Sequence, residues 1–338
     1  MNHLNSNALL EWYDRVKRDL PWRSTNNPYV IWVSEIILQQ TRVNQGLPYY
    51  YTFLQAYPTV FDLANTYESQ LKYFILCIEQ NIKPMNSFKE SLNIFKVNLS
   101  INIISEPSGV KEGFINILPI EKNVTFEIGQ PNKNNNGATL ESIDKAIYFA
   151  KNKKISGIVT LPIYKKNLIE DGFKFPGHTE YLSYKDNSEP LMILMNKKLK
   201  VATVTTHIPI RKISESLNQS LIIKKINILN DSLIRDFKVN SPKIAISSLN
   251  PHAGEGGKIG REEIDIIIPA IKQLRKDNIT VIGPLPADTL FNKENLNEYN
   301  ARLCMFHDQA VIPNKTLDFF NGINFTAGLS FIRTSPDH

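Results

Sequence analysis

Apolar residues in the second half of the chain occur in short runs, and a polar or glycine-rich loop follows most of them. These runs have the length and the β-branched content of buried strands. They cover residues 155–160, 191–195, 199–206, 243–249, 279–282 and 301–306. Helical spacing of apolar residues begins at Thr139 and again at Glu262, and the second pattern reaches about Lys276. Strands that alternate with helices predict an α/β domain.

The first 66 residues show a different pattern. Apolar residues recur there at helical spacing over residues 8–20, 28–41 and 49–56, and no strand pattern is present. After Thr66 the chain changes to strand-like pieces rich in Lys, Asn and Ile, and a polar loop is predicted at residues 129–137. We therefore predict a short all-α segment at residues 1–66 and an α/β region at residues 67–338.

The composition is typical of a globular protein with a sizeable core, at 42% hydrophobic and 21% charged residues. No apolar run reaches about 18 residues and the N-terminal residues lack a signal-peptide pattern, so a cytoplasmic protein is expected. Cys77 and Cys304 both lie in apolar surroundings, which predicts two buried free thiols. The net charge of +6 is carried by scattered lysines, so it does not indicate a nucleic-acid-binding stripe.

Four of the six histidines, His178, His207, His252 and His307, lie in polar loops between or after predicted strands. The carboxyl ends of parallel strands meet at one edge of a sheet, so several of these imidazoles are expected to converge. Three neutral imidazoles can hold a divalent metal and leave positions open for a substrate. A single histidine is more often a structural residue, and no short-range histidine pair is present, so spacing alone leaves that alternative open.

Six motifs distinguish residues 67–338. They lie at residues 176–180 (Pro-Gly-His-Thr-Glu), 205–209 (Thr-Thr-His-Ile-Pro), 249–257, 283–289, 307–309 (His-Asp-Gln) and 331–338. Through these motifs the region resembles 4-hydroxythreonine-4-phosphate dehydrogenase, a family of NAD-dependent enzymes of pyridoxal phosphate biosynthesis. The resemblance implies an isocitrate/isopropylmalate dehydrogenase-like two-domain α/β fold. It also implies a homodimer whose active site lies between the subunits.

The resemblance assigns roles to individual residues of this chain. The implied metal ligands are His207, His252 and His307, and the implied substrate contacts are His178, Thr179, Lys315, Asn324 and Arg333. Asp288 and Asp308 match carboxylates beside the metal, and either of them is a candidate for the catalytic proton relay. Taken without the resemblance, Lys315 is equally well a solvated lysine and Arg333 a member of a structural ion pair.

The implied reaction is the oxidation and decarboxylation of 4-phosphohydroxy-L-threonine to 3-amino-2-oxopropyl phosphate. It requires NAD or NADP and a divalent metal such as Zn, Mg or Co. Fixed positive charge at Lys315 and Arg333 suits a substrate that carries a phosphate and a carboxylate. The chain contains no Gly-x-Gly-x-x-Gly motif, so a Rossmann-type nucleotide site is not expected.

The chain departs from the family pattern at both ends. The family's first strand with its glycine-rich loop is replaced by residues 1–66, and the family continues past the position of His338. We therefore expect an incomplete dehydrogenase joined near residue 66 to a foreign segment, with impaired activity. Two smaller departures are Ala310, where glycine is usual, and Ser330, where proline is usual.

Residues 1–66 resemble the start of A/G-specific adenine glycosylases, through the motifs at residues 20–23, 28–43 and 57–60. That resemblance implies a general acid at Glu35 and DNA contacts at Gln39 and Gln40. The second carboxylate and the four cysteines of an iron–sulfur cluster are missing, so glycosylase activity is not expected. The alternatives to a dehydrogenase are a DNA-binding protein led by this segment and a non-catalytic fragment that binds metal or phosphate.

Overall fold

A computed structural model describes residues 20–21, 25, 30, 33–34, 43–56, 100–122, 132–161, 163–319 and 321–337. The chain separates into two compact units, residues 1–72 with 89–99 and residues 73–88 with 100–338. In the smaller unit, helix α3 (Val43–Ala56) contains the predicted helix at 49–56 and begins six residues before it. Its Tyr50 is buried in a small cluster with Leu20 and Val33.

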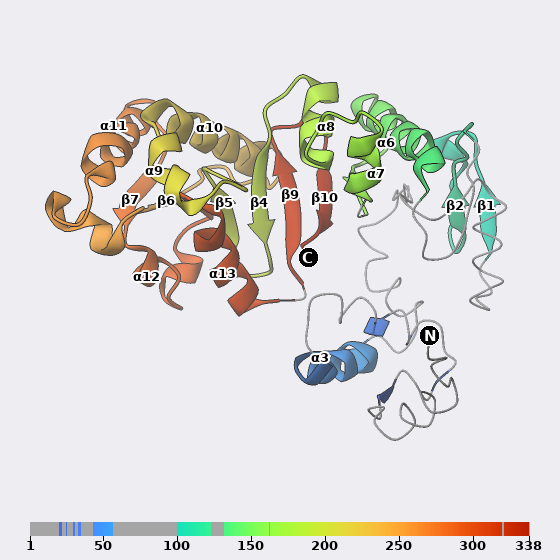
Figure 1. The fold of residues 1–338 in the computed structure, drawn as a ribbon, viewed down its shortest axis with the longest axis horizontal. Helices are drawn as coiled ribbons and strands as arrows, with labels where there is room; N and C mark the ends of the chain where they lie inside the picture. The colour runs from blue at the N-terminus through green and yellow to red at the C-terminus, as the bar shows by residue number, and fades with distance from the viewer. Residues whose placement is uncertain are drawn as a thin grey trace, which may run out of the picture. The chain divides into compact units, whose positions relative to one another are not determined.

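The larger unit is built on one eight-stranded sheet (Figure 1). In sheet order the strands are β3 (Ile158–Val159), β10 (Arg333–Pro336), β9 (Ile323–Ala327), β4 (Leu191–Met195), β5 (Lys200–Thr203), β8 (Ala301–Cys304), β6 (Ile244–Ser247) and β7 (Val281–Leu285). The last four are parallel to one another, whereas β4 is antiparallel to both β5 and β9. The predicted mixed α/β architecture is confirmed.

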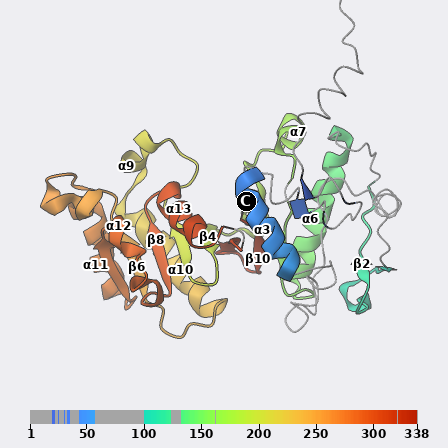
Figure 2. The same ribbon diagram turned by 90° about the horizontal axis from the view of Figure 1, so that it is seen from below.

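The central strands are apolar on both faces because helices cover both faces. Every residue of β6 and β8 is buried. Helix α10 (Gln219–Arg235) packs Ile222, Ile226, Leu229 and Leu233 against one face, together with α11 (Ile268–Lys276). Helix α13 (His307–Leu317) packs on the other face of the sheet (Figure 2). It covers alternate strand residues such as Leu194 and Cys304. Cys304 is a buried free thiol, as its apolar surroundings predicted, and this burial raises its pKa. The other predicted buried thiol, Cys77, lies outside the described residues.

A second core lies beside β3, where helices α6 (Asn136–Lys151), α7 (Lys165–Glu170) and α8 (His178–Asp186) are found. A two-stranded parallel sheet, β1 (Ile101–Ile103) and β2 (Ile115–Ile117), lies next to α6 (Figure 1). The prediction of a polar loop through residue 137 is wrong at its end, because α6 already begins at Asn136. That helix buries Asn136 and Ala138, and this tertiary burial outweighs the polar local sequence.

The remaining elements are short. They are η2 (Pro107–Gly109), η3 (Lys133–Asn135), η4 (Ile210–Lys212), α9 (Ile213–Ser216), η5 (Pro251–Gly257), the π-helical turn η6 (Glu263–Ile267), α12 (Ala287–Leu290) and η7 (Asn295–Asn297). The predicted helix at 262–276 is therefore confirmed as η6 followed by α11. Among the described helices, none has both the length and the apolar character needed to cross a membrane.

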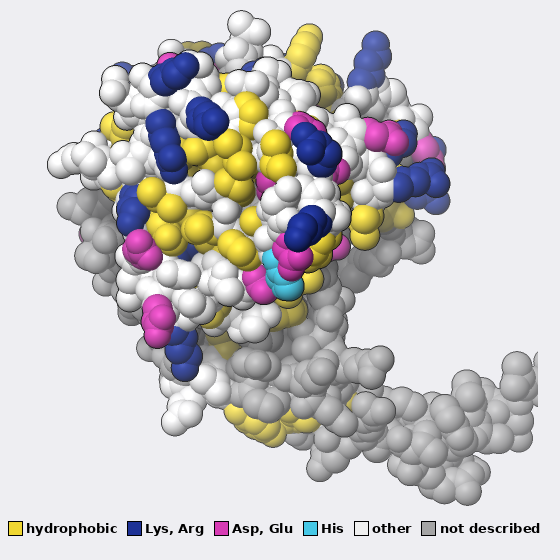
Figure 3. All heavy atoms as spheres, turned by 90° about the vertical axis from the view of Figure 1, so that its left-hand side faces the viewer, with side chains coloured by type: hydrophobic (Ala, Val, Ile, Leu, Met, Phe, Trp, Pro, Cys, Tyr) yellow, Lys and Arg dark blue, Asp and Glu magenta, His cyan; other side chains and the backbone are white. Residues whose placement is uncertain are grey.

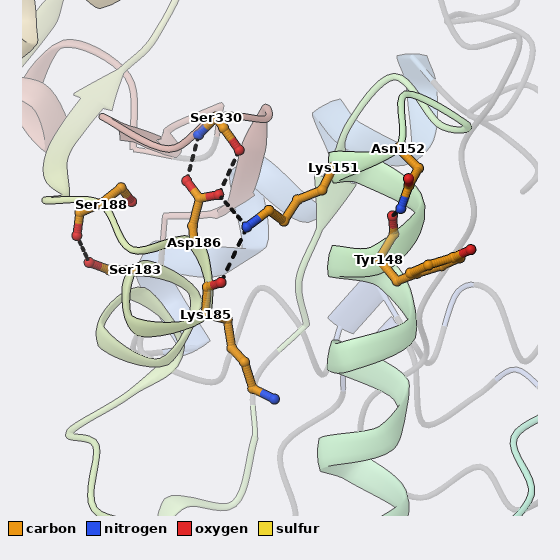
Figure 4. A network of polar contacts seen from close by, with 8 residues as sticks. All are labelled: Tyr148, Lys151, Asn152, Ser183, Lys185, Asp186, Ser188 and Ser330. Carbon is orange, nitrogen blue, oxygen red and sulfur yellow. Dashed lines mark hydrogen bonds and ion pairs between the residues drawn. The ribbon is translucent and has the colours of Figure 1, made fainter.

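One polar network ties α8 to the bend that precedes β10 (Figure 4). The buried carboxylate of Asp186, at the end of α8, accepts hydrogen bonds from the backbone N–H (2.7 Å) and the hydroxyl (2.6 Å) of Ser330. It also pairs with the Lys151 ammonium of α6 at 3.3 Å. Burial raises the pKa of Asp186, but these hydrogen bonds outweigh it and hold the pKa below its usual value. A proline at position 330 could supply neither bond, so the serine here has a specific structural role.

Candidate active site

The carboxyl ends of the four parallel strands carry the three predicted metal ligands and Asp288, one of the two candidate proton relays. The chain leaves β5 toward His207, β8 toward His307, β6 toward His252 and β7 toward Asp288. The imidazole rings of His207 and His307 lie side by side, with 5.4 Å between their centroids. This pair is possible because β5 and β8 are neighbours in the sheet, although about 100 residues separate them in the chain.

The neighbours of His307 fix the start of α13. The His307 Nδ1 atom lies 2.9 Å from the Asp308 carboxylate. The Gln309 side chain accepts a hydrogen bond from the Met305 backbone N–H and donates one to the Ser248 carbonyl, both at 2.8 Å. Gln309 therefore connects the ends of β8 and β6, which keeps the two histidine loops in register.

The loop η5 that carries His252 has an unusual backbone. Residues 252–257 all have positive φ, from 43° at Glu255 to 93° at Gly257. Non-glycine residues rarely adopt this left-handed conformation, and such strain is concentrated at functional sites. The exposed His252 ring lies 2.8 Å from the Glu255 carboxylate. That hydrogen bond, and less strongly the charge of Asp288, raises the pKa of His252.

The positions of these side chains indicate how far one chain can provide the ligands of a metal ion. His207 and His307 form a pair of nitrogen donors of the type that divalent transition metals prefer. In the described part of the chain, no three histidine, cysteine or carboxylate side chains come close enough together to hold an ion. The donor chemistry therefore fits a metal, and the pair needs a further ligand to complete a site.

A cationic group lies at the far end of α13. The Lys315 ammonium is 2.8 Å from the backbone carbonyl of Asp337 and 3.1 Å from its carboxylate. The two side chains are only 14% and 11% exposed, which contradicts the alternative of a solvated lysine. Buried Asn314 donates a hydrogen bond to the same carboxylate at 3.3 Å and accepts one from Asn196 at 3.0 Å.

Arg333 and Asn324 lie on the same face of the sheet. Arg333 is 4% exposed, and its guanidinium donates to the hydroxyls of Thr326 (2.9 Å) and Thr160 (2.5 Å). Asn324 is opposite Ser335 in the β9–β10 pair, so its side chain points to the same face as Arg333. The buried Oδ1 atom of Asn324 accepts no hydrogen bond from the described residues. Buried polar atoms are nearly always hydrogen-bonded, so this acceptor requires an explanation such as a ligand.

His178 and Thr179 lie elsewhere, in the first turn of α8. The N-terminal end of a helix carries a partial positive charge, which suits contact with an anion. The predicted glycosylase-like residues Glu35, Gln39 and Gln40 lie outside the described residues, so that interpretation stays a prediction.

Sequence inspection missed several residues that support the site. Thr160 and Thr326 hold Arg333, and Glu263 contacts the backbone of the His252 loop. Only Glu263 had a usable signal in the sequence. It belongs to a Glu-Glu pair that begins a helix directly after a glycine-rich loop, where a carboxylate can accept free N–H groups.

Comparison with known proteins gives consistent matches. The model of the family described as pyridoxal phosphate biosynthetic protein PdxA matches residues 73–338. The 4-hydroxythreonine-4-phosphate dehydrogenase of Zymomonas mobilis is 40% identical over 76% of this chain and 79% of its own length. The enzyme of the same name from Bradyrhizobium diazoefficiens is 43% identical over 67% of this chain and 68% of its own length.

A solved structure agrees with these matches. The crystal structure of 4-hydroxythreonine-4-phosphate dehydrogenase from Klebsiella pneumoniae superimposes with a TM-score of 0.70 at 34% identity. The match covers 75% of this chain and 78% of that protein. The mixed α/β fold with its central sheet is therefore the fold of these enzymes.

Proposed function

Because the chain belongs to the pyridoxal phosphate biosynthetic protein PdxA family, we propose that it acts as a metal- and NAD-dependent 4-hydroxythreonine-4-phosphate dehydrogenase. One observation in this chain supports the proposal most directly. Helix α13 begins at His307, which pairs with His207, and carries Lys315 two turns later. Eight residues of helix span about 12 Å, so one rigid element presents a metal ligand near one end of a substrate and a cation near the other.

The substrate-binding residues follow from charge and position. Lys315 and Arg333 bind the anionic groups of the substrate, and the unsatisfied acceptor of Asn324 takes a hydrogen bond from it. The ammonium of Lys315 exchanges its contact with Asp337 for the substrate anion. His178 and Thr179, at the positively polarised start of α8, add a further contact to the substrate anion.

His207, His252 and His307 would hold the divalent metal. When bound, the metal supplies Lewis acidity at the secondary hydroxyl, and NAD or NADP supplies the hydride acceptor. Asp288 or Asp308 receives the hydroxyl proton, since the Asp308 carboxylate contacts His307 and the charge of Asp288 acts on His252. The oxidised β-keto acid loses carbon dioxide and leaves 3-amino-2-oxopropyl phosphate.

A second copy of the chain completes the site in this proposal. The described residues of one chain offer two adjacent imidazoles and no third ligand beside them, which supports a homodimer with the site between subunits. Figure 3 shows apolar side chains gathered on the side of the larger unit where α11 and β7 lie. Strand β7 is an edge of the sheet with partly exposed residues from Ile282 to Leu285, a surface suited to pairing with a partner.

Two coarser expectations complete the proposal. Hydrophobic clusters cover both faces of the sheet in the larger unit and a further cluster lies beside β3, which supports an isocitrate/isopropylmalate dehydrogenase-like arrangement. The low cysteine content, two in 338 residues, supports a cytoplasmic location.

The test is reduction of NAD by the purified full chain with 4-phosphohydroxy-L-threonine, after chelation and after return of Zn, Mg or Co. We expect turnover that requires one of these metals and that is lost in His207→Ala. The exposed residue Lys212, in the same loop region, provides the control Lys212→Ala. Full turnover in the chelated protein would refute the role of the metal. A folded protein that shows no turnover with any of these metals would refute the proposed dehydrogenase activity.

A further inference from the structure

The strained loop η5 must be held in place by something other than its own backbone preference. His252, Ala253 and Glu255 all have φ between 43° and 53°, in a run of six residues with positive φ. Consecutive left-handed residues are disfavoured for side chains with a Cβ atom. The His252 side chain is exposed, so packing of that side chain does not secure the loop either.

A single buried carboxylate contacts the start of this loop. Glu263 is 1% exposed, and its Oε1 atom accepts the backbone N–H groups of Leu249 and Asn250, both at 2.8 Å. Its Oε2 atom accepts the side-chain amide of Asn250 at 2.9 Å. The same amide donates to Glu262 at 2.7 Å. Glu263 therefore holds both the backbone and the side chain of the residue that precedes η5.

Two glycines show how closely the loop fits around this carboxylate. A Cβ atom at Gly254 would lie 2.7 Å from the Oε2 atom of Glu263. A Cβ atom at Gly260 would overlap the side-chain amide of Asn250. The loop thus leaves space for Glu263 and Asn250 and for little else.

We propose that Glu263 is a positioning residue for His252: its carboxylate fixes the entry to the left-handed loop and thereby the place of the imidazole. Glu263 does not touch the reacting groups, and its effect is transmitted through Asn250 and the backbone of η5. The inference rests on the proposed metal role of His252. Groups that orient a metal ligand typically contribute about 10- to 100-fold to metal affinity.

The test measures zinc affinity of the full-length protein by competition with a chromophoric chelator, without turnover. Glu263→Ala removes all three hydrogen bonds and should raise the dissociation constant for zinc about 10- to 100-fold. Glu263→Gln keeps an oxygen for the two backbone N–H groups, so it should lie within about 3-fold of the wild type, since only the contact to the Asn250 amide is lost. Hydrogen exchange at the amides of Leu249 and Asn250 should accelerate in the alanine variant and not in the glutamine variant.

A control and a second route keep the outcome decisive. Asp265→Ala removes an exposed carboxylate of the same helical turn, paired with Arg261, and should change neither zinc affinity nor amide exchange. If Glu263→Ala does not fold, Gly260→Ala displaces Asn250 by steric overlap and should weaken zinc binding in the same way.

The result that overturns the inference is wild-type zinc affinity in Glu263→Ala together with loss of affinity in His252→Ala. Wild-type affinity in His252→Ala would instead remove the ligand assignment on which the inference depends, and the inference falls with it. In the double variant, His252→Ala should add little to Glu263→Ala, because the alanine at 263 has already displaced the imidazole.

Discussion

The guanidinium of Arg333 offers the sharpest test of how the anion end of the site is built. Arg333 bridges Thr326 on β9 and Thr160 at the end of β3, and all three residues are buried. Arg333→Lys keeps the positive charge and removes the planar fork. A lysine has a single ammonium at the end of a flexible chain and can retain at most one of the two bonds.

The expected cost follows from these contacts. A hydrogen bond from a charged donor contributes about 1.5–3 kcal/mol, and a buried hydroxyl left without its partner costs about 1–3 kcal/mol. The two effects overlap, so we expect Arg333→Lys to lower the free energy of unfolding by about 2–4 kcal/mol. Because the hydroxyls also orient the guanidinium, the KM for the phosphorylated substrate should rise while the KM for NAD stays unchanged.

Urea denaturation of four proteins measures this: wild type, Arg333→Lys, Thr326→Val and the double variant. Thr326→Val should destabilise the wild type and have little further effect when residue 333 is lysine. The double variant should therefore lose less stability than the sum of the single variants, by about 1 kcal/mol or more. Additive losses, within about 0.5 kcal/mol, would show that the guanidinium does not bridge the two strands and would refute this reasoning.

Three further predictions concern the network, the metal and the core. Burial raises the pKa of Asp186, but the hydrogen bonds from Ser330 hold it below its usual value. The ionised carboxylate therefore stabilises the fold above its unfolded pKa of about 4, and this stabilisation is lost as the pH falls through the folded pKa. Asp186→Asn should flatten the acid limb of the melting-temperature profile, and an unchanged limb would contradict this. His307→Ala should lose bound zinc on dialysis, as measured by elemental analysis, and wild-type zinc content would remove His307 from the ligand set. Leu229 on α10 is 0% exposed, so Leu229→Ala should lower the free energy of unfolding in urea by about 2–5 kcal/mol. Ile234 on the same helix is 45% exposed, so Ile234→Ala should lower it by less than about 1 kcal/mol. Equal losses would refute the packing of this face of α10.

Local pattern in the sequence predicted much of the larger unit. The strand predicted at 191–195 is observed with the same bounds, and those at 243–249 and 301–306 contain β6 and β8. Buried parallel strands are recognisable because both faces must be apolar over consecutive residues. The positions of His207, His252 and His307 after such strands also followed from the chain alone.

The loop before α6 shows where that pattern fails. Residues up to 137 are polar and contain several asparagines, which favours a loop locally. The structure buries Asn136, whose amide donates to the Asn167 carbonyl at 3.0 Å and thereby connects the start of α6 to α7. A contact between residues 31 positions apart leaves no periodic signal in either segment.

Sequence therefore determined which residues end the strands, while the tertiary structure decided which of them meet. The sheet order β5, β8, β6, β7 differs from the chain order, and it is this order that places His207 beside His307 rather than beside His252. The tertiary structure also decides that Lys315 is buried against Asp337 and that Glu263 contacts the backbone just before η5. The physical reason is that hydrophobic periodicity reports the burial of each element, whereas neighbours in a sheet are selected by packing between segments far apart in the chain.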